Sequence, residues 1–275
     1  MAIPQSLRFF VAPTESGLLR MTGSFVFAFW AGEMNALLLS FLLGLTAAAA
    51  NVFGGLLIIR REWGRESLKY FIALGSGFML ATALLEMVPE GLKLAGEWAL
   101  PLVLGGYLLV HFFEHTITAH FHFGEEVHPE ELVRPQVGYA AVLGMLIHAF
   151  FDGAAIASGF IVSTWLGAVV FLAVFLHKIP DGFTVASVML ASGRGPRRAM
   201  GAAMLMGAAT LGGLALMWLL RGQVAYGLPL SAGATLYVAA SDLMPEVNRE
   251  PGIMMAVWVF VGVGLMFALR LLAHL

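Results

Sequence analysis

Two related stretches, HAFFDGAAIAS at 148–158 and HKIPDGFTVAS at 177–187, decide how this chain is expected to fold. Both fit the pattern His-x-x-x-Asp-Gly-x-x-x-Ala-Ser, and the second follows the first at an offset of 29 residues. Each stretch lies within a long apolar run, and residues four positions apart share one face of a helix. We therefore expect two apolar helices that each carry a His and an Asp on one face.

The composition around these stretches is typical of a membrane protein. Of the 275 residues, 60% are hydrophobic and 12% are charged, and the mean hydropathy is +0.87. Soluble globular chains have about 45–50% apolar and about 25% charged residues, so this chain has too few charges to cover a water-facing surface. The composition excludes a soluble enzyme, a nucleic-acid-binding protein and a disordered scaffold. It predicts an all-α, polytopic membrane protein.

Apolar segments long enough to cross a membrane recur along the chain. A spanning helix needs roughly 20 mostly apolar residues, and such segments lie at 35–59, 69–90, 99–121, 137–162, 165–191, 199–220, 228–247 and 252–273. We therefore expect eight transmembrane helices in a domain of residues 35–275, with a cytoplasmic loop at 116–136. Residues 1–34 are expected to be interfacial or part of an extra helix. They lack a signal-peptide pattern, so we expect an unprocessed chain.

The positions of Lys and Arg predict the orientation, because cytoplasmic loops of membrane proteins are rich in these residues. With the N-terminus outside, nine basic residues fall on the cytoplasmic side and five on the outer side. We therefore expect both termini to be extracytoplasmic, in the plasma (inner) membrane. The fifteenth basic residue, Lys178, lies inside a predicted helix.

A second repeat relates the two halves of the chain. GFMLATALLEMVPE at 77–90 matches GATLYVAASDLMPE at 233–246, with an offset of 156 residues and no gap. In the eight-helix topology the two stretches run in opposite directions, as in the inverted repeats of many transporters. Pro89, Pro180 and Pro245 are expected to interrupt their helices near a binding site. These matches predict inverted-repeat symmetry.

The motif residues His148, Asp152, His177 and Asp181 are candidate metal ligands. An ionisable side chain in the bilayer interior costs about 2.5–3.5 kcal/mol on insertion scales. These four residues and Lys178 make five such side chains on two helices, so we expect them to have a function. Two imidazoles and two carboxylates suit divalent zinc. The alternative is a proton relay, or a polar network that joins the helices without metal.

The predicted loop and the helix before it are rich in histidine and glutamate. His111, Glu114 and His115 share one helical face, and His120, His122 and His128 follow in the loop. Together the five histidines are a candidate metal-collecting patch on the cytoplasmic side. The alternative is an ordinary solvated loop.

These motifs resemble those of the ZIP (Zrt/Irt-like protein) family of divalent metal transporters. HAFFDG and HKIPDG are similar to the paired signature helices of that family, and GFMLATALLEMVPEG at 77–91 and SAGATLYVAASDLMPEV at 231–247 support the match. The resemblance covers nearly all of the chain from about residue 35. It implies a carrier that brings zinc, or alternatively cadmium, iron or manganese, toward the cytoplasm by alternating access.

The resemblance also implies roles for individual residues. His148 and Asp152 match the helix-four ligands of the family, and Asp181 matches the bridging carboxylate of helix five. His177 falls on a helix-five site position. Met79 matches a thioether ligand on helix two, although a Met on an apolar helix usually packs in the core.

The chain departs from family members that bind two adjacent metals. Ala149 and Lys178 stand where those members have an Asn and a carboxylate. Those members also have a Glu on helix six, whereas no carboxylate lies between 199 and 220 here. This is similar to the subgroup with His-Lys-x-Pro on helix five. Lys178 is three residues from Asp181, so its ammonium can reach the carboxylates and partly neutralise them. We therefore predict one transported ion, with Lys178 as a substitute for the second.

Four further acidic residues mark a candidate pathway. Glu86 and Glu90 on the second helix mirror Asp242 and Glu246 on the seventh. A carboxylate pair at each mouth would attract cations and pass them to the centre. For Glu90 and Glu246 the alternative is a helix-capping role in the headgroup region.

Two other functional classes compete with a metal carrier. An intramembrane metal-dependent hydrolase would also place His and Asp in helices, but His-Glu-x-x-His and Gly-x-Ser-x-Gly patterns are missing. A proton-coupled carrier of another solute is the second alternative. We expect a non-enzymatic protein without a prosthetic group, whose partners are the metal ion and the bilayer, and not nucleic acid. A homodimer is expected from the family resemblance.

Overall fold

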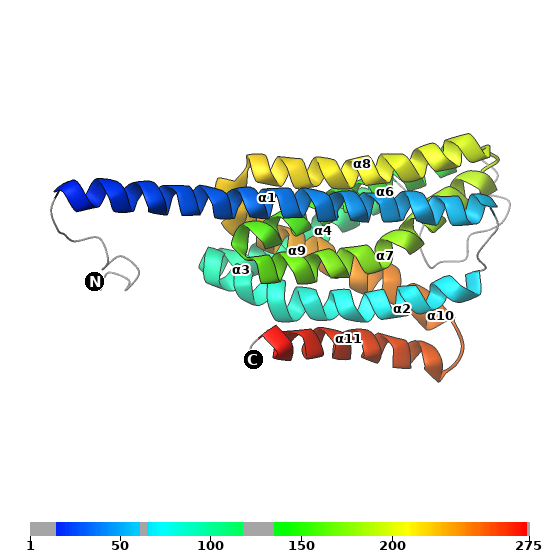
Figure 1. Cartoon of the computed structure of the whole chain (residues 1–275). Coiled ribbons are helices and arrows are strands. Elements are labelled where there is room, and N and C mark those ends of the chain that lie inside the picture. Colours follow the sequence, from blue (N-terminus) through cyan, green and yellow to red (C-terminus); the bar gives the residue numbers. More distant parts are fainter. Residues whose placement is uncertain (1–14, 61–64, 118–134, 274–275) are drawn as a thin grey trace.

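The computed structural model describes residues 15–60, 65–117 and 135–273, and within these ranges every regular element is a helix (Figure 1). This confirms the all-α prediction. The elements are α1 (Glu15–Arg60), α2 (Arg65–Thr82), η2 (Ala83–Met87), α3 (Val88–Ala95), η3 (Gly96–Trp98), α4 (Ala99–Ile117), α6 (Pro135–Val162), α7 (Thr164–Ala191), α8 (Pro196–Leu219), η4 (Arg221–Gln223), α9 (Val224–Tyr237), η5 (Val238–Leu243), α10 (Met244–Arg249) and α11 (Ile253–Ala273).

The long helices lie side by side in one bundle (Figure 1). We call the end at which α6 ends and α7 begins the Ser163 end, and the opposite end, at which α1 ends and α2 begins, the Arg60 end. By length and composition, 6 stretches of the described residues qualify as membrane spans. One of them, Lys69–Thr116, contains α2, α3 and α4, and the run from α9 to α10 is not among the six. The predicted number of eight is therefore not confirmed.

Helix α1 is longer than its predicted span. It begins at Glu15 and continues without a break to Arg60, a length of 46 residues. Figure 1 shows it projecting beyond the other helices toward the N-terminus. No helix boundary therefore occurs at residue 34, and the division of the chain into 1–34 and 35–275 stays a prediction.

The second sequence repeat has a structural counterpart in two π-helical segments. The run α2–η2–α3 is continuous with its π segment at 83–87, and the run α9–η5–α10 is continuous with its π segment at 238–243. Shifting 83–87 by the repeat offset of 156 gives 239–243, which lies within the second segment and ends at the same residue. Pro89 and Pro245 are the second residues after these segments, and they lack the N–H of an ordinary helical hydrogen bond. By contrast, Pro180 lies inside α7 without ending it, so the expected interruption there is wrong.

Four helix pairs pack through one glycine from each helix. At each of these glycines, an added Cβ would lie between 1.8 and 2.2 Å from a carbonyl oxygen of the facing helix. Such distances leave no room for a side chain and allow the backbones to touch. The pairs are Gly54 with Gly182 (α1 and α7), Gly153 with Gly213 (α6 and α8), Gly106 with Gly233 (α4 and α9), and Gly77 with Gly262 (α2 and α11).

These glycine contacts repeat the sequence offsets. Gly77 and Gly233 differ by 156 positions, and so do Gly106 and Gly262. Therefore the contact of α2 with α11 corresponds to that of α9 with α4. Likewise Gly153 and the glycine at 182 differ by 29 positions, the offset of the first repeat. Glycines at close helix contacts thus recur at the offsets of both sequence repeats.

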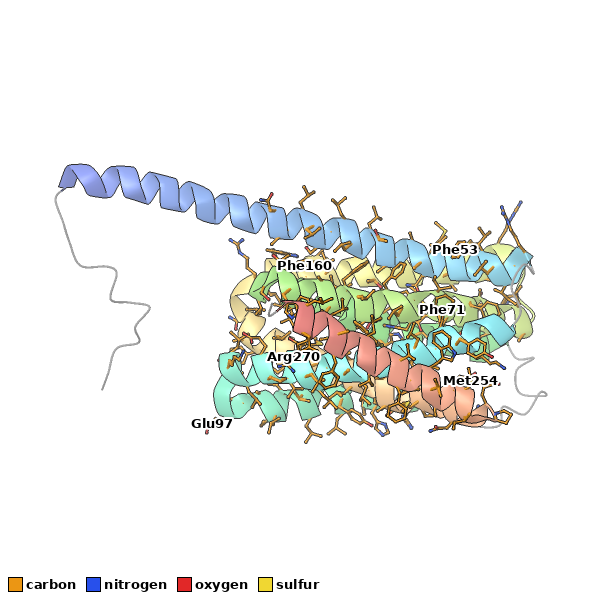
Figure 2. All side chains as sticks on the ribbon, turned by 60° about the horizontal axis from the view of Figure 1, so that its bottom comes forward. Phe53, Phe71, Glu97, Phe160, Met254 and Arg270 are labelled. Atoms are coloured by element: carbon orange, nitrogen blue, oxygen red, sulfur yellow. The ribbon has the colours of Figure 1, made fainter. Side chains whose placement is uncertain are left out.

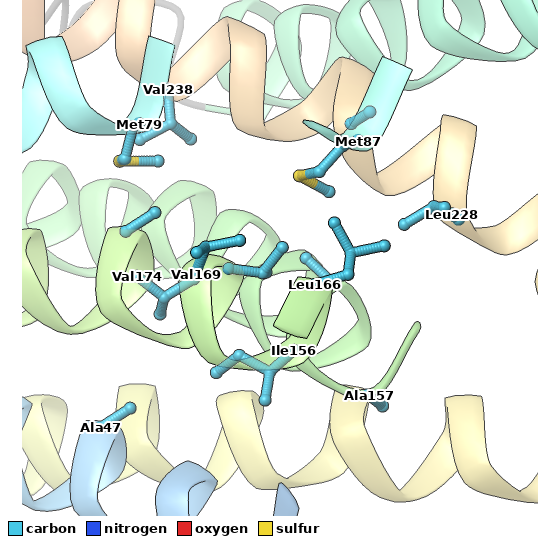
Figure 3. Packing of buried hydrophobic residues seen from close by; sticks show 14 of the residues in the cluster. Ala47, Met79, Met87, Ile156, Ala157, Leu166, Val169, Val174, Leu228 and Val238 are labelled. Atoms are coloured by element: carbon cyan, nitrogen blue, oxygen red, sulfur yellow. The ribbon is translucent and has the colours of Figure 1, made fainter. Parts of the chain in front are cut away.

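The buried core is apolar, and so is much of the exterior. Figure 3 shows Met79 of α2 beside Val238 of η5, facing Val169 and Val174 of α7 in the main buried cluster. Figure 2 shows apolar side chains that point outward, among them Phe53, which is 47% exposed. An apolar exterior on apolar helices of this length is what a lipid environment requires.

Candidate functional site

The polar pairs of the repeated motif meet between α6 and α7. His148 and Asp152 of α6 and His177 and Asp181 of α7 are buried, and one ligand atom of each lies within 4.8 Å of the others. His148 Nε2 is 3.0 Å from Asp181 Oδ2, and His177 Nε2 is 3.2 Å from Asp152 Oδ2. Within each helix the His–Asp distances are 3.6 and 3.7 Å. We call these four residues the central group.

The glycine after each aspartate orients the two helices. Gly153 packs against the backbone of α8, and Gly182 packs against the backbone of α1. Successive residues of an α-helix differ in direction by about 100°, so Asp152 and Asp181 point away from these contacts. Because the glycines face outward to α8 and α1, the aspartates are left to face each other's helix. This accounts for the Asp-Gly step in both copies of the motif.

A backbone hydrogen bond holds the ring of His177. Its Nδ1 lies 3.0 Å from the carbonyl oxygen of Ala173, one turn earlier in α7, and can bond to that oxygen only as an N–H donor. In a neutral ring Nε2 then presents a lone pair to the Asp152 carboxylate, 3.2 Å away. Two acceptors at that distance repel unless a proton or a metal cation lies between them. The central group is therefore suited to a cation.

Lys178 supplies a positive charge inside the same cluster. Its side chain is fully buried, and its ammonium donates to the carboxylate of Asp152 and to Asp181 Oδ2 at 3.2 Å. The predicted reach of this lysine is therefore observed. With neutral imidazoles, two aspartates and one lysine leave a charge of −1, which a divalent ion would turn to +1. A buried charge needs such partners, because an unpaired one is very costly.

A second set of ligands adjoins the central group and shares His148 with it. One ligand atom each of Glu114, His148 and Asp242 lie within 4.8 Å of one another. The hydroxyl of Tyr237 is hydrogen-bonded to Glu114. Asp242 was a predicted pathway residue, whereas Glu114 was placed only on a helical face with two histidines. Glu114 on α4 and Asp242 on η5 come together only in the folded chain, and no local sequence pattern links them.

At the Ser163 end, the predicted pathway glutamates have cationic or N–H partners. Glu86 Oε1 lies 3.2 Å from Arg270 Nε, and the indole N–H of Trp165 donates to Glu86 Oε2 at 3.3 Å. Glu90 pairs with Lys93 at 2.7 Å on the same helix. The pair of Glu90 agrees with its alternative role at a helix end.

The histidine patch is described only in part. His111 and His115 are exposed and stack with their ring centroids 3.9 Å apart, while His115 Nδ1 bonds to the carbonyl oxygen of His111 at 3.0 Å. His120, His122 and His128 lie outside the described residues. A metal site in this patch therefore stays a prediction.

Two other predicted pathway or ligand residues differ in their surroundings. Met79 is fully buried in the apolar cluster beside Val238 (Figure 3). This position serves core packing, and its role as a thioether ligand stays a prediction. Glu246 lies half-buried in α10, three residues before the end of that helix.

Comparison with known proteins places the chain in a family. The family described as ZIP Zinc transporter matches residues 125–270, slightly more than half of the chain. Human Zinc transporter SLC39A7 is 30% identical over 150 residues, which cover 50% of this chain and 32% of the relative. Zinc transporter ZIP9-B of Xenopus laevis is 24% identical over 258 residues, which cover 75% of this chain and 84% of the relative.

The match to the first of these relatives spans about a third of that protein's length. The family and both relatives have names of transporters and not of enzymes, in agreement with the prediction of a non-enzymatic protein. The chain belongs to the ZIP zinc transporter family.

Proposed function

We propose that this ZIP family member carries divalent transition-metal ions, zinc foremost, across a membrane toward the cytoplasm through the central group. The observation that carries the proposal is the convergence of two buried His–Asp pairs from the repeated motif, one on α6 and one on α7. A buried group with this much ligand chemistry, in a family of zinc transporters, is a reasonable place for the transported ion.

The spacing of the central group suits a tetrahedral ion. Zinc bound by imidazole nitrogen and carboxylate oxygen at about 2.0–2.2 Å has neighbouring ligand atoms about 3.3–3.5 Å apart. The four His–Asp distances are 3.0, 3.2, 3.6 and 3.7 Å. These donor atoms are therefore already near the spacing that an ion requires, but the ion must displace the Lys178 ammonium from both carboxylates. Cadmium, iron and manganese accept the same donors, so the ligands alone do not rank these metals.

Lys178 limits the centre to one transported ion in this proposal. The ammonium already contacts both carboxylates, so it takes the place that a second divalent ion would have between them. This is the role expected for the His-Lys-x-Pro subgroup. An incoming ion must compete with the lysine for Asp152 and Asp181, and the same competition helps release it.

Alternating access would expose the centre first at the Ser163 end and then at the Arg60 end. The glycine contacts of α6 with α8 and of α7 with α1 support this, because bare backbone surfaces slide with little steric hindrance. Glu86 and Glu90 would serve the first mouth, and Asp242 and Glu246 the second. With the predicted orientation, the Arg60 end faces the cytoplasm.

Metal uptake into proteoliposomes tests the proposal. The purified chain is reconstituted around a metal-sensitive dye, and zinc, cadmium, iron and manganese are added outside in separate runs. We expect saturable uptake that His177→Ala abolishes and that Glu97→Gln, a change at an exposed residue of η3, leaves intact. Absence of flux for all four metals with the unmodified chain would refute the transport function.

A further inference from the structure

The turn between α7 and α8, at the Arg60 end of the bundle, carries three arginines within five residues. Arg194 lies in the turn itself, and Arg197 and Arg198 are exposed in the first turn of α8. The sequence has no Asp or Glu between 181 and 242. Within the described residues, none of the three guanidinium groups has a carboxylate or another hydrogen-bond acceptor as partner. We call these residues the arginine turn.

The backbone of the turn holds Arg194 in a fixed position. Gly193 has a φ of +77°, and the backbone N–H of Arg194 donates to the carbonyl oxygen of Met189 at 2.9 Å, so α7 ends in a Schellman motif. The guanidinium carbon of Arg194 lies 4.7 Å from the ring centroid of Tyr139 on α6, a cation–π contact. Its Nε is buried against the protein. The outer N–H groups are therefore left for an acceptor outside the protein.

The helix dipole adds to the charge of the turn. Arg197 and Arg198 follow Pro196 at the N-terminus of α8, the end at which the dipole already places partial positive charge. Basic side chains are unfavourable there, and the N-cap residue Gly195 has no side chain to accept from the free backbone N–H groups. An anion bound beside the turn would offset both repulsions.

The arginine turn lies where the apolar exterior of the bundle stops. Tyr139 and Leu143 of α6 are exposed, and so are Met204 and Leu205 of α8. At 1.5 Å per residue, the exposed residues of α8 begin about 10 Å beyond Arg198. An aromatic ring at the edge of an apolar surface, followed by basic side chains, is typical of the headgroup level of a bilayer. The turn is therefore at the depth of lipid phosphates.

We propose that Arg194, Arg197 and Arg198 bind the phosphate of an anionic lipid in the leaflet at the Arg60 end. Guanidinium groups bind phosphate oxygens through paired N–H donors, and basic pockets between membrane helices bind anionic headgroups. The acyl chains lie along the exposed apolar side chains of α6 and α8. Because Arg194 follows α7 and stacks on α6, the bound headgroup links the two helices that carry the central group.

The apolar surface beside the turn favours a lipid over two other anions. Inorganic phosphate has no apolar part to bury there. The glutamates of the loop before α6, at 125, 126, 130 and 131, lie outside the described residues. A carboxylate from that loop would not account for the exposed apolar surface next to the turn.

Native mass spectrometry of the full chain in detergent, titrated with phosphatidylglycerol or phosphatidylcholine, tests the site. Phosphatidylglycerol should bind more tightly than phosphatidylcholine, and Arg197→Gln or Arg198→Gln should weaken its binding about fivefold each. Arg249→Gln is the matched control. Arg249 is exposed at the same end of the bundle, but its helix α10 packs on α2 and α11, whereas α8 packs on α1, α6 and α7. The control should leave the affinity for phosphatidylglycerol unchanged.

Equal affinities for the two lipids, or an equal loss in Arg249→Gln, would overturn the lipid site. Stabilisation by sodium phosphate that the arginine changes abolish, without an advantage of phosphatidylglycerol, would assign the turn to a free anion instead. Unchanged lipid binding in the arginine variants, with an equal fall of the unfolding midpoint in these variants and in Glu130→Gln/Glu131→Gln, would assign it to the loop. Each of these results overturns the lipid site and leaves the transport proposal untouched, because none of them depends on metal flux.

Discussion

Replacement of Lys178 by methionine tests the most unusual feature of the centre. Methionine has a similar length and no charge, so the change removes the ammonium from between Asp152 and Asp181 without a large change in volume. At 3.2 Å from Asp181, the gross Coulomb attraction of one such pair is about 5 kcal/mol at an effective dielectric constant of about 20. Desolvation offsets much of it. Measured losses on breaking a buried pair are about 3–5 kcal/mol.

The metal-free variant should therefore unfold at a lower temperature than the unmodified chain. With about 2–4 °C per kcal/mol for a chain of this size, the midpoint should fall by about 6–20 °C. Zinc should restore more stability to the variant than to the unmodified chain, because it no longer competes with the lysine. If the variant binds zinc ten times more tightly than the unmodified chain, excess zinc raises its free energy of unfolding by about 1.4 kcal/mol more. This corresponds to an additional rise of about 3–6 °C in the midpoint.

The assay is thermal unfolding of the detergent-solubilised protein, with chelator and with excess zinc. Lys69→Met is the matched control, because Lys69 also pairs with a carboxylate, Glu250, at 3.3 Å, but the two side chains are 21% and 38% exposed. Exposed pairs contribute about 0–1 kcal/mol, so this variant should change little. Equal midpoints for Lys178→Met and the unmodified chain, with equal shifts by zinc, would refute the substitute-cation role. So would normal transport together with no second metal bound at the centre.

Two further predictions follow from contacts away from Lys178. Gly182→Ala should destabilise the protein by about 1–3 kcal/mol, because its Cβ would lie 1.9 Å from a carbonyl oxygen of α1. Gly212→Ala is the control, because a Cβ added there would have no atom of another segment within 4 Å, and it should melt no lower than the unmodified chain. Arg270→Gln should free Glu86 and lower the metal concentration for half-maximal uptake in proteoliposomes; an unchanged value would show that this pair does not restrain entry.

Most of the central group could be predicted from sequence because its geometry is local. The spacing of His148 and Asp152 fixes a common helical face, and the repeat places an equivalent pair on α7. Even the reach of Lys178 follows from its three-residue distance to Asp181. These relations depend on helical periodicity, which the sequence determines directly.

The remaining features depend on contacts between distant segments. Glu114 and Asp242 meet only because Gly106 and Gly233 bring α4 against α9, and no local pattern links them. Glu86 and its partner Arg270 lie on η2 and α11, and no local pattern links these two residues either. Pro180 was expected to break its helix, but α7 continues through it. Packing on neighbouring helices compensates for the missing hydrogen bond in that case.

The paired π segments have a consequence for the angular phase of their helices. An α-helix advances about 100° per residue, and a π segment accommodates one extra residue per turn. All side chains beyond Met87, and those beyond Leu243, are therefore rotated by about that angle from an uninterrupted α-helical course. Deleting one residue from 83–87 would bring that half into α-helical phase and turn Glu90 to a different neighbour. The run α9–η5–α10 would keep its π segment and its rotation. The side chains of α3 and α10, which the two π segments now rotate equally, would then differ in direction by roughly a quarter turn.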